Sequence, residues 1–276
     1  MEKLNFLTAG IPIISEKAGY KGAFKTLKEL NLDGMELEFV HGVRISDENK
    51  EIVRNAVKDG FVITSHAPFY INLNSKEQEK VVASVERIVE TARVAHSVGG
   101  FSITFHAAFY MGNSQDIVFD KVVKQFEIIT DILKKENTDI FIRPETTGKG
   151  TQWGSLEEIV KISKIFDRVL PCVDFSHIHA RTGGKYNTYD EFSKSLEYIG
   201  NELGTYALEN FHAHVAGIAY TSKGERHHLN LEESDFNYKD LLKSLKNFDI
   251  KGALVCESPN IEADAQLMKN YYLSIN

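Results

Sequence analysis

Eight apolar runs with the composition of β-strands alternate with helix-type segments along the whole chain. The strand-like runs are Leu4–Ala9, Gly34–Val40, Phe61–Ser65, Phe101–Phe105, Asp139–Arg143, Arg168–Val173, Asn210–Val215 and Gly252–Cys256. The helix-type segments are Tyr20–Leu30, Ser46–Lys58, Ser75–Ser97, Asp116–Lys135, Ser155–Phe166, Thr188–Leu203, Asn237–Lys246 and Ile261–Tyr272. Such alternation favours a parallel sheet, and eight units in about 250 residues match the size of a (β/α)₈ barrel. We therefore predict an α/β fold, a TIM barrel, with residues 1–276 as a single domain.

Local signals mark where several of these helices begin and end. Ser46 is of a residue type that caps helix N-termini, and Ser155-Leu-Glu-Glu158 has the pattern of a capping box. Gly99-Gly100 is a helix stop. The alternative to a barrel is a doubly wound open sheet. The first repeat lacks the Gly-x-Gly-x-x-Gly turn of a dinucleotide-binding fold, so the sequence gives that fold no support.

Composition narrows the classes of protein that the chain can belong to. No apolar run approaches the roughly 20 residues of a membrane span, and the strand-like run close behind Met1 leaves no room for a signal peptide. Cys172 and Cys256, the only cysteines, lie in apolar runs, so we expect reduced thiols and a cytoplasmic protein. The net charge of −7 argues against a protein that coats nucleic acid by bulk charge. Local nucleic-acid binding stays open, because bound cations can dominate the charge of a site.

Metal-binding residue types stand at the ends of six successive predicted strands, the third to the eighth. These residues are His66, His106, Glu145, Asp174 with His177, His212 and His214 with Glu225, His227 and His228 in the following loop, and Glu257. Each alone could be a polar loop residue, and Asp174 could simply form a turn. Together they point to one site, because active sites of barrels are built at this end of the strands.

The residue types favour particular metals. Carboxylates and imidazoles without thiolates suit Zn²⁺ or Mn²⁺. The supply of ligands exceeds one tetrahedral site, so we expect a cluster of two or three ions.

Several motifs resemble those of the endonuclease IV family of abasic-site endonucleases, within the xylose-isomerase-like barrel superfamily. The motifs are His66-Ala-Pro-Phe-Tyr-Ile-Asn72, Glu145-Thr-Thr-Gly-Lys-Gly150, Cys172-Val-Asp-Phe-Ser-His177, Glu225-Arg-His-His228 and Glu257-Ser-Pro259. The chain departs from the family pattern at Glu225, where the family usually has Asp, and at Thr146, where it has Asn.

The resemblance implies nine residues around three zinc ions, with manganese as an alternative metal. His66 and His106 would bind one ion, which Glu145 would bridge to a second. Asp174, His214 and Glu257 would complete the second site, and His177, Glu225 and His227 would bind the third. His212 is the fallback for His214, since both lie on the same strand face.

The implied activity is zinc-dependent hydrolysis of the phosphodiester 5′ to an abasic site in duplex DNA, a step of base-excision repair, by a monomeric catalytic domain. Glu145 would orient the attacking hydroxide. For DNA contact we select aromatic and basic residues of the strand-to-helix loops: Arg44, Phe69, Tyr70, Lys149, Arg181 and Lys223. Phe69 or Tyr70 would wedge into the base stack, although either could instead cap the barrel mouth.

Two other functions stay open. A sugar isomerase or epimerase of the same superfamily would hold one divalent ion with Glu145, Asp174, His214 and Glu257. The five remaining ligands favour the nuclease, since a one-metal enzyme does not need them. A non-catalytic metal-binding relative is the third alternative, which the intact ligand set disfavours.

Overall fold

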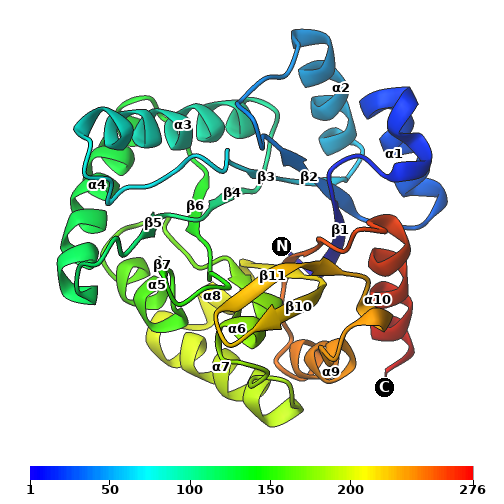
Figure 1. Cartoon of the computed structure of the whole chain (residues 1–276). Helices are drawn as coiled ribbons and strands as arrows, with labels where there is room; N and C mark the ends of the chain where they lie inside the picture. Colours follow the sequence, from blue (N-terminus) through cyan, green and yellow to red (C-terminus); the bar gives the residue numbers. More distant parts are fainter. Residues whose placement is uncertain (276) are drawn as a thin grey trace.

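The structure, a computed structural model, describes residues 1–275 and contains a parallel eight-stranded sheet curled into a barrel (Figure 1). The strands follow each other in space as β6, β4, β3, β2, β1, β12, β9 and β8. Their bounds are β1 Leu4–Ala9, β2 Gly34–Glu38, β3 Val62–His66, β4 Ser102–Phe105, β6 Phe141–Pro144, β8 Val173–Asp174, β9 Phe211–Val215 and β12 Gly252–Cys256.

Two isolated bridges close the ring between its first and last strands. Ile142 pairs with Val169, and Glu145 pairs with Cys172, both in parallel. The segment that contains Val169 and Cys172 runs directly into β8, so β6 is joined to β8 through it. This closure confirms the predicted TIM barrel and excludes the open sheet. It also shortens the predicted sixth strand, of which only Val173 belongs to the regular ladder.

Helices surround the barrel as an outer layer (Figure 1). Eight of them follow the strands: α1 Gly19–Glu29, α2 Asp47–Lys58, α3 Gln78–Ser97, α4 Gln115–Lys135, α5 Leu156–Ser163, α7 Tyr189–Leu203, α9 Tyr238–Asn247 and α10 Glu262–Ser274. Four short helical turns were not predicted from the sequence, namely η1 Ile13–Ala18, α6 Phe175–Arg181, α8 Thr205–Glu209 and η2 Leu231–Glu233. Among residues 1–275, no helix combines the length and the apolar character needed to cross a bilayer.

Side-chain caps mark the start of several helices. The Ser46 side chain accepts a hydrogen bond from the Asn49 amide at 3.2 Å, and Ser155 and Glu158 form the predicted capping box. The third helix begins at Gln78 rather than at Ser75. Its predicted start is occupied by a turn, in which the amide of Ser75 bonds to the carbonyl of Asn72 at 3.2 Å.

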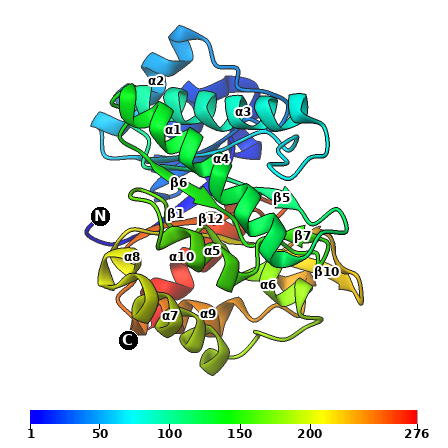
Figure 2. The same ribbon diagram turned by 90° about the vertical axis from the view of Figure 1, so that its left-hand side faces the viewer.

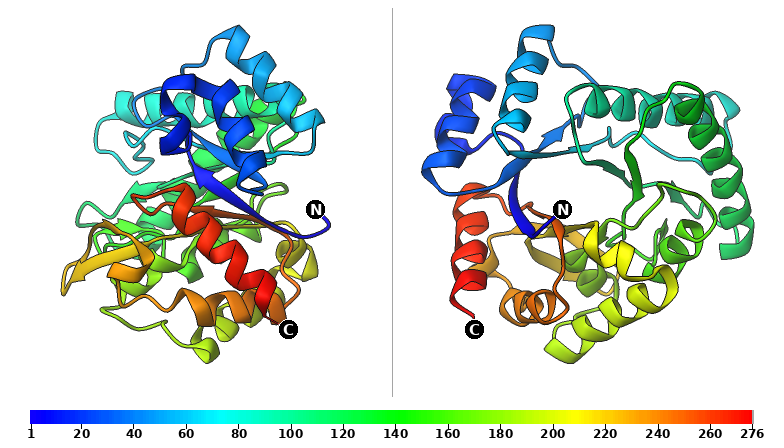
Figure 3. Two further views of the ribbon diagram at one scale, coloured as in Figure 1. Left: turned by 90° about the vertical axis from the view of Figure 1, so that its right-hand side faces the viewer. Right: turned by 180° about the vertical axis from the view of Figure 1, so that it is seen from behind.

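Two small antiparallel sheets of two strands each, of which only the first is a hairpin, extend from the barrel end at which the strands finish. β10 (Gly217–Thr221) pairs with β11 (Gly224–Leu229), and β5 (Ala108–Phe109) pairs with β7 (Gln152–Trp153). Figure 2 shows β5, β7 and β10 at one end of the molecule and the N-terminus at the other. The left view in Figure 3 shows the same separation from the other side, with the N-terminus at the right and the yellow hairpin of β10 and β11 at the left. The β10–β11 hairpin lies in the segment that was expected to be a loop after the seventh predicted strand.

The inside of the barrel is polar over much of its length. Leu7, Ala253 and Val255 form a small apolar cluster separate from the two large ones. Elsewhere the buried residues carry hydrogen-bonding groups, including Glu36, His212, His214, Ser102 and Arg143. The Arg143 guanidinium donates to the carbonyl of Pro171 at 2.9 Å and to that of Asn210 at 2.5 Å. Such buried polar groups are costly unless they are paired, so they indicate a site rather than a packed core.

Candidate metal centre

A cavity of about 400 Å³ lies at the C-terminal ends of the strands. We call it the central cavity; it is lined by Ala9, Glu38, His66, Phe69, His106, Glu145, His177, Glu225, His228 and Glu257. Of the described residues that line it, none is lysine or arginine. Carboxylates and imidazoles therefore dominate its wall.

The first group of possible ligands surrounds Glu145. His66, the last residue of β3, lies with Nε2 at 3.4 Å from Oε2 of Glu145. His106, directly after β4, lies with Nε2 at 3.0 Å from Oε1 of the same carboxylate. Ligand atoms of these three residues lie within 4.8 Å of one another. The predicted first ion therefore has its three residues in one place.

A second group shares Glu145. Ligand atoms of Glu145, Asp174, His214 and Glu257 also lie within 4.8 Å of one another. His214 Nδ1 lies 3.2 Å from Glu257 Oε1 and 3.6 Å from Glu145 Oε2. Buried Oδ2 of Asp174 and buried Nδ1 of His214 have no hydrogen-bond partner among the described residues. A divalent cation would satisfy both atoms, so this donor set fits a metal ion.

A third group differs from the predicted one, because it contains Asp174 and His228 in place of Glu225 and His227. Asp174, His177 and His228 bring ligand atoms within 4.8 Å, and Nε2 of His177 lies 3.5 Å from Oε2 of Glu225. The side chain of His227 is exposed and lies outside all of these groups.

A β-bulge is the reason for this difference. Glu225 pairs with Tyr220, and His227 already pairs with Ala219, so Arg226 is an extra residue in β11. Because side chains alternate along a strand, the extra residue reverses the phase. His228 then lies on the same face as Glu225, and His227 lies on the other.

Two glycines let β11 approach the loop after β6. A Cβ on Gly148 would lie 2.6 Å from Oε2 of Glu225 and 3.0 Å from Cδ2 of His177. A Cβ on Gly224, whose φ is +96°, would lie 2.3 Å from the carbonyl oxygen of Gly148. The amide of Glu225 donates to that same carbonyl at 2.9 Å. Only glycine at these two positions allows Glu225 to reach His177.

Burial and mutual charge set the protonation of the ligand groups. Burial disfavours the charged form of Glu145, but the imidazoles of His106 and His214 outweigh it and hold the pKa of Glu145 well below its usual range. Burial likewise opposes the charge of His177, but Asp174 and Glu145 outweigh it and raise the pKa of His177 to about 10. Burial raises the pKa of Asp174 to about 8. A cation bound at the centre would therefore compete with protons for these groups.

Two glutamates of β2 belong to the site and were not selected from the sequence. Glu36 is buried, with Oε1 at 3.0 Å from Nε2 of His214 and Oε2 at 3.2 Å from Nε2 of His212. The hydroxyl of Ser102 lies 2.9 Å from Nδ1 of His212. His212 therefore contacts the same Glu36 carboxylate as His214 and is not itself in the three groups of ligands. Although burial opposes the charge of Glu36, the pairing with His214 holds the pKa of this carboxyl below its usual range.

Glu38 faces the central cavity, and burial together with the charge of Glu36 raises its pKa to about 8. Both glutamates could have been found in Gly34-Met-Glu-Leu-Glu38, because alternate residues of a strand share one face. Two carboxylates on one face of an otherwise apolar strand are the signal.

The residues selected for DNA contact occupy different settings. Phe69 and Tyr70 are 63% and 62% exposed, and the edge of the Phe69 ring packs on His66 with centroids 5.8 Å apart. Arg44 and Lys223 are exposed, and Lys149 is half-buried. Arg181 Nη1 donates to Thr147 Oγ1 at 2.9 Å and to the carbonyl oxygens of Lys149 at 2.6 Å and Gln152 at 3.0 Å. These bonds assign Arg181 to holding the loop after β6.

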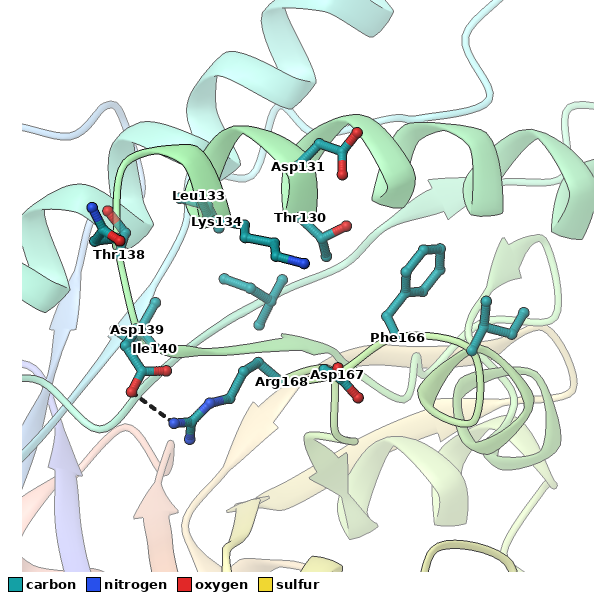
Figure 4. Close-up of a pocket in the computed structure, with 13 residues that line it drawn as sticks. Thr130, Asp131, Leu133, Lys134, Thr138, Asp139, Ile140, Phe166, Asp167 and Arg168 are labelled. Atoms are coloured by element: carbon teal, nitrogen blue, oxygen red, sulfur yellow. Dashed lines mark hydrogen bonds and ion pairs between the residues drawn. The ribbon is translucent and has the colours of Figure 1, made fainter.

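A larger cavity of about 550 Å³ lies at the opposite end of the barrel (Figure 4). It is bounded by the end of α4 and by the segments that lead into β6 and β8, and the ion pair of Asp139 with Arg168 at 2.7 Å lies at one side of it. It contains none of the predicted ligands. The central cavity is therefore the candidate site despite its smaller volume.

Proteins with similar sequences include an uncharacterized protein and several probable endonucleases. An uncharacterized protein of Methanocaldococcus jannaschii is 43% identical over 269 residues, which cover 98% of this chain and 97% of that protein. A probable endonuclease 4 of Mycoplasma pneumoniae is 25% identical over 211 residues, which cover 75% of this chain and 70% of that protein.

This chain shares its fold with solved structures of both epimerases and endonucleases. A D-tagatose 3-epimerase-like protein has a TM-score of 0.73 and 22% identity, covering 96% of this chain and 97% of that chain. Endonuclease IV from Thermus thermophilus has a TM-score of 0.70 and 15% identity, covering 99% of this chain and 100% of that chain. At such identities the structures show the fold alone.

A sequence model of the family described as xylose isomerase-like TIM barrel matches residues 24–271. This match covers most of the chain, and it agrees with the superfamily that the motifs indicated. The chain belongs to the xylose isomerase-like TIM barrel family.

Proposed function

We propose that the protein is a zinc-dependent endonuclease that hydrolyses the phosphodiester 5′ to an abasic site in duplex DNA. One observation carries this proposal: the three groups of ligands are connected by shared carboxylates. Glu145 belongs to the first and second groups, and Asp174 belongs to the second and third. A carboxylate shared by two groups can bridge two ions, which is the arrangement of multi-metal phosphodiester hydrolysis.

The ions would act as Lewis acids toward the phosphoryl oxygens. The side chains of the protein would position the ions and the attacking water. Glu145 is buried between His66 and His106, and it can accept a hydrogen bond from an attacking water. The central cavity has no lysine or arginine among its described lining residues, so neutralisation of a phosphate there would depend on the cations. Phe69 and Tyr70, exposed beside His66, would contact the DNA at the rim.

The relatives support the same reaction class. Proteins named probable endonuclease 4, from several organisms, align with 66–81% of this chain at 21–25% identity. Their names support an endonuclease, and the abasic site as substrate comes from the resemblance of the motifs to the endonuclease IV family.

A one-metal sugar epimerase is the second candidate. Two observations favour it: Glu145, Asp174, His214 and Glu257 alone can surround one ion, and neither lysine nor arginine lines the cavity among the described residues. Its substrate would be a neutral sugar rather than a polyanion. The two candidates differ in the number of bound ions and in the substrate.

The decisive experiment measures both. Purified protein is analysed for metal by inductively coupled plasma mass spectrometry. It is then incubated with a duplex that contains one abasic site and, separately, with D-fructose and other ketoses. Two or three zinc ions per chain with incision 5′ to the lesion support the nuclease. One ion with ketose epimerisation and no incision would replace it with the epimerase. Undamaged duplex is the control substrate.

A further inference from the structure

A third cavity of about 360 Å³ lies on the β1 and β2 side of the molecule. We call it the β1 cavity; it is lined by Gly10, Ile11, Ile13, Glu16, Tyr20, Glu36, Leu37, Glu38 and Ile261. Glu38 lines both this cavity and the central cavity. The two cavities therefore meet at the Glu38 side chain. The metal ligands proposed above do not use the β1 cavity.

The Glu38 carboxyl has an atom that needs a partner. Its Oε1 is shielded from solvent and forms no hydrogen bond with the described protein atoms. The backbone directly after β1 packs against this side chain, since a Cβ on Gly10 would lie 3.4 Å from Cγ of Glu38. Gly10 is in turn fixed to β2 by the hydrogen bond from its amide to the carbonyl of Glu36 at 2.9 Å. A buried oxygen without a partner, on a side chain that lines a cavity, indicates a ligand that donates to it.

The wall of the β1 cavity indicates what kind of group fits. Ile11, Leu37 and Ile261 supply apolar surface, and Tyr20 adds a phenol to the carboxyl of Glu38. The described lining contains no lysine or arginine, as in the central cavity. Apolar walls with a few polar groups bind neutral ligands that carry hydroxyl groups. A phosphate or carboxylate would meet glutamates without a counter-charge.

We propose that the β1 cavity is a subsite for an uncharged, hydroxyl-bearing part of the substrate, and that Glu38 hydrogen bonds to one of its hydroxyl groups. This inference deepens the proposed function and rests on it for the identity of the sugar. In abasic DNA the hydroxyl is the one on C1′ of the deoxyribose that has lost its base. A free ketose would offer the same chemistry, so the experiment separates the two sources.

The first arm compares two duplexes. One contains a natural abasic site, and the other contains the tetrahydrofuran analogue, which lacks the C1′ hydroxyl. We expect the wild type to prefer the natural site by about tenfold in kcat/KM, the value of one hydrogen bond. Glu38→Leu should lower that preference to near one, and Glu38→Gln should restore part of it. Glu127→Leu, at an exposed position on α4, is the control and should keep the preference. Equal rates on both duplexes in the wild type, or an unchanged preference in Glu38→Leu, would overturn the subsite for DNA.

The second arm does not depend on DNA cleavage. Binding of 2-deoxy-D-ribose and of D-fructose to the metal-loaded protein is measured by saturation-transfer-difference NMR. We expect at least one sugar to bind, and Glu38→Leu and Tyr20→Phe to weaken it several-fold relative to Glu127→Leu. Sugar binding without incision would reject the nuclease and keep the subsite. Incision without a hydroxyl preference and without sugar binding would keep the nuclease and reject the subsite.

Discussion

The carboxylate of Glu36 lies 3.0 Å from Nε2 of His214, while Nδ1 of the same ring faces Glu257 at 3.2 Å. A carboxylate behind a metal-binding histidine fixes the orientation of its ring and raises its basicity. Glu36 is thus placed to orient His214 toward the second group of ligands. Its contact with His212 connects the site to the interior of the barrel.

Glu36→Gln should weaken metal binding without removing a ligand. We expect a loss of about 10–100-fold in affinity for the ion held by His214, because the amide orients the imidazole less well. Titration against a competing chelator measures this affinity, with Glu127→Gln as the control. Equal affinities in the two variants would show that the pairing of Glu36 with His214 is only structural.

His228 and His227 form a matched pair of substitutions. Since His228 belongs to the third group and His227 points away from it, His228→Ala should remove about one metal ion per chain, and His227→Ala should remove none. Metal analysis after dialysis compares the two. The opposite result would show that β11 adopts the regular register when metal is bound.

Gly148→Ala should disturb the third group by steric contact alone. The added methyl group would fall 2.6 Å from Oε2 of Glu225, so the β10–β11 hairpin must move. We expect loss of the third ion and a large drop in incision rate, with the fold retained by circular dichroism. Gly150→Ala is the control, because a Cβ at Gly150 meets nothing within 4 Å. Equal behaviour of both variants would contradict the role of this contact.

Glu145→Gln should abolish DNA incision. The carboxylate serves two of the ligand groups, and an amide cannot bridge two cations. We expect a fall in rate of at least about a thousandfold, together with lower metal content, when the variant is assayed on the abasic duplex. Near-normal cleavage would remove Glu145 from its proposed role.

Asp33 makes stability depend on pH away from the site. Its carboxylate receives hydrogen bonds from Lys269 at 2.9 Å, from Lys3 at 2.6 Å and from the amide of Phe6 at 3.0 Å. Although burial opposes the charge, these bonds hold the pKa of Asp33 below its ordinary value of 3.8. A depressed pKa contributes stability above the ordinary value, and this contribution is lost as the pH falls through the folded-state pKa.

Asp33→Asn should therefore lower the free energy of unfolding by about 1–3 kcal/mol at pH 7 and by less below pH of about 3. Urea denaturation at both pH values measures the difference. Asp120→Asn, exposed on α4, should have little effect at either pH. A constant difference between the two pH values would contradict the pH dependence.

The strands, and the ligand-type residues at their ends, could be predicted because both follow from the residue types of short segments. Alternation of strand and helix specified the barrel, and the ends of β3, β4 and β6 brought His66, His106 and Glu145 together as expected. Glu36 was missed although two carboxylates on one face of β2 were a signal, because its specific partners, His212 and His214, lie on a distant strand.

The placement of His227 could not be foreseen for a related reason. The bulge at Arg226 depends on how β11 pairs with β10, and residue types alone do not fix that pairing. The contacts of Arg181 could not be predicted for the same reason, since its partners are backbone carbonyls of another loop.

The bulge in β11 also bears on how this strand tolerates change. If Arg226 paired with Ala219, His227 would oppose Ile218 and take the inward position that His228 now holds. The two adjacent histidines therefore keep an imidazole facing the site in either register. Elsewhere in a sheet, an insertion or slip of one residue exchanges an inward for an outward side chain. In β11 the same slip would replace one histidine by its neighbouring histidine, so the inward side chain would still be an imidazole.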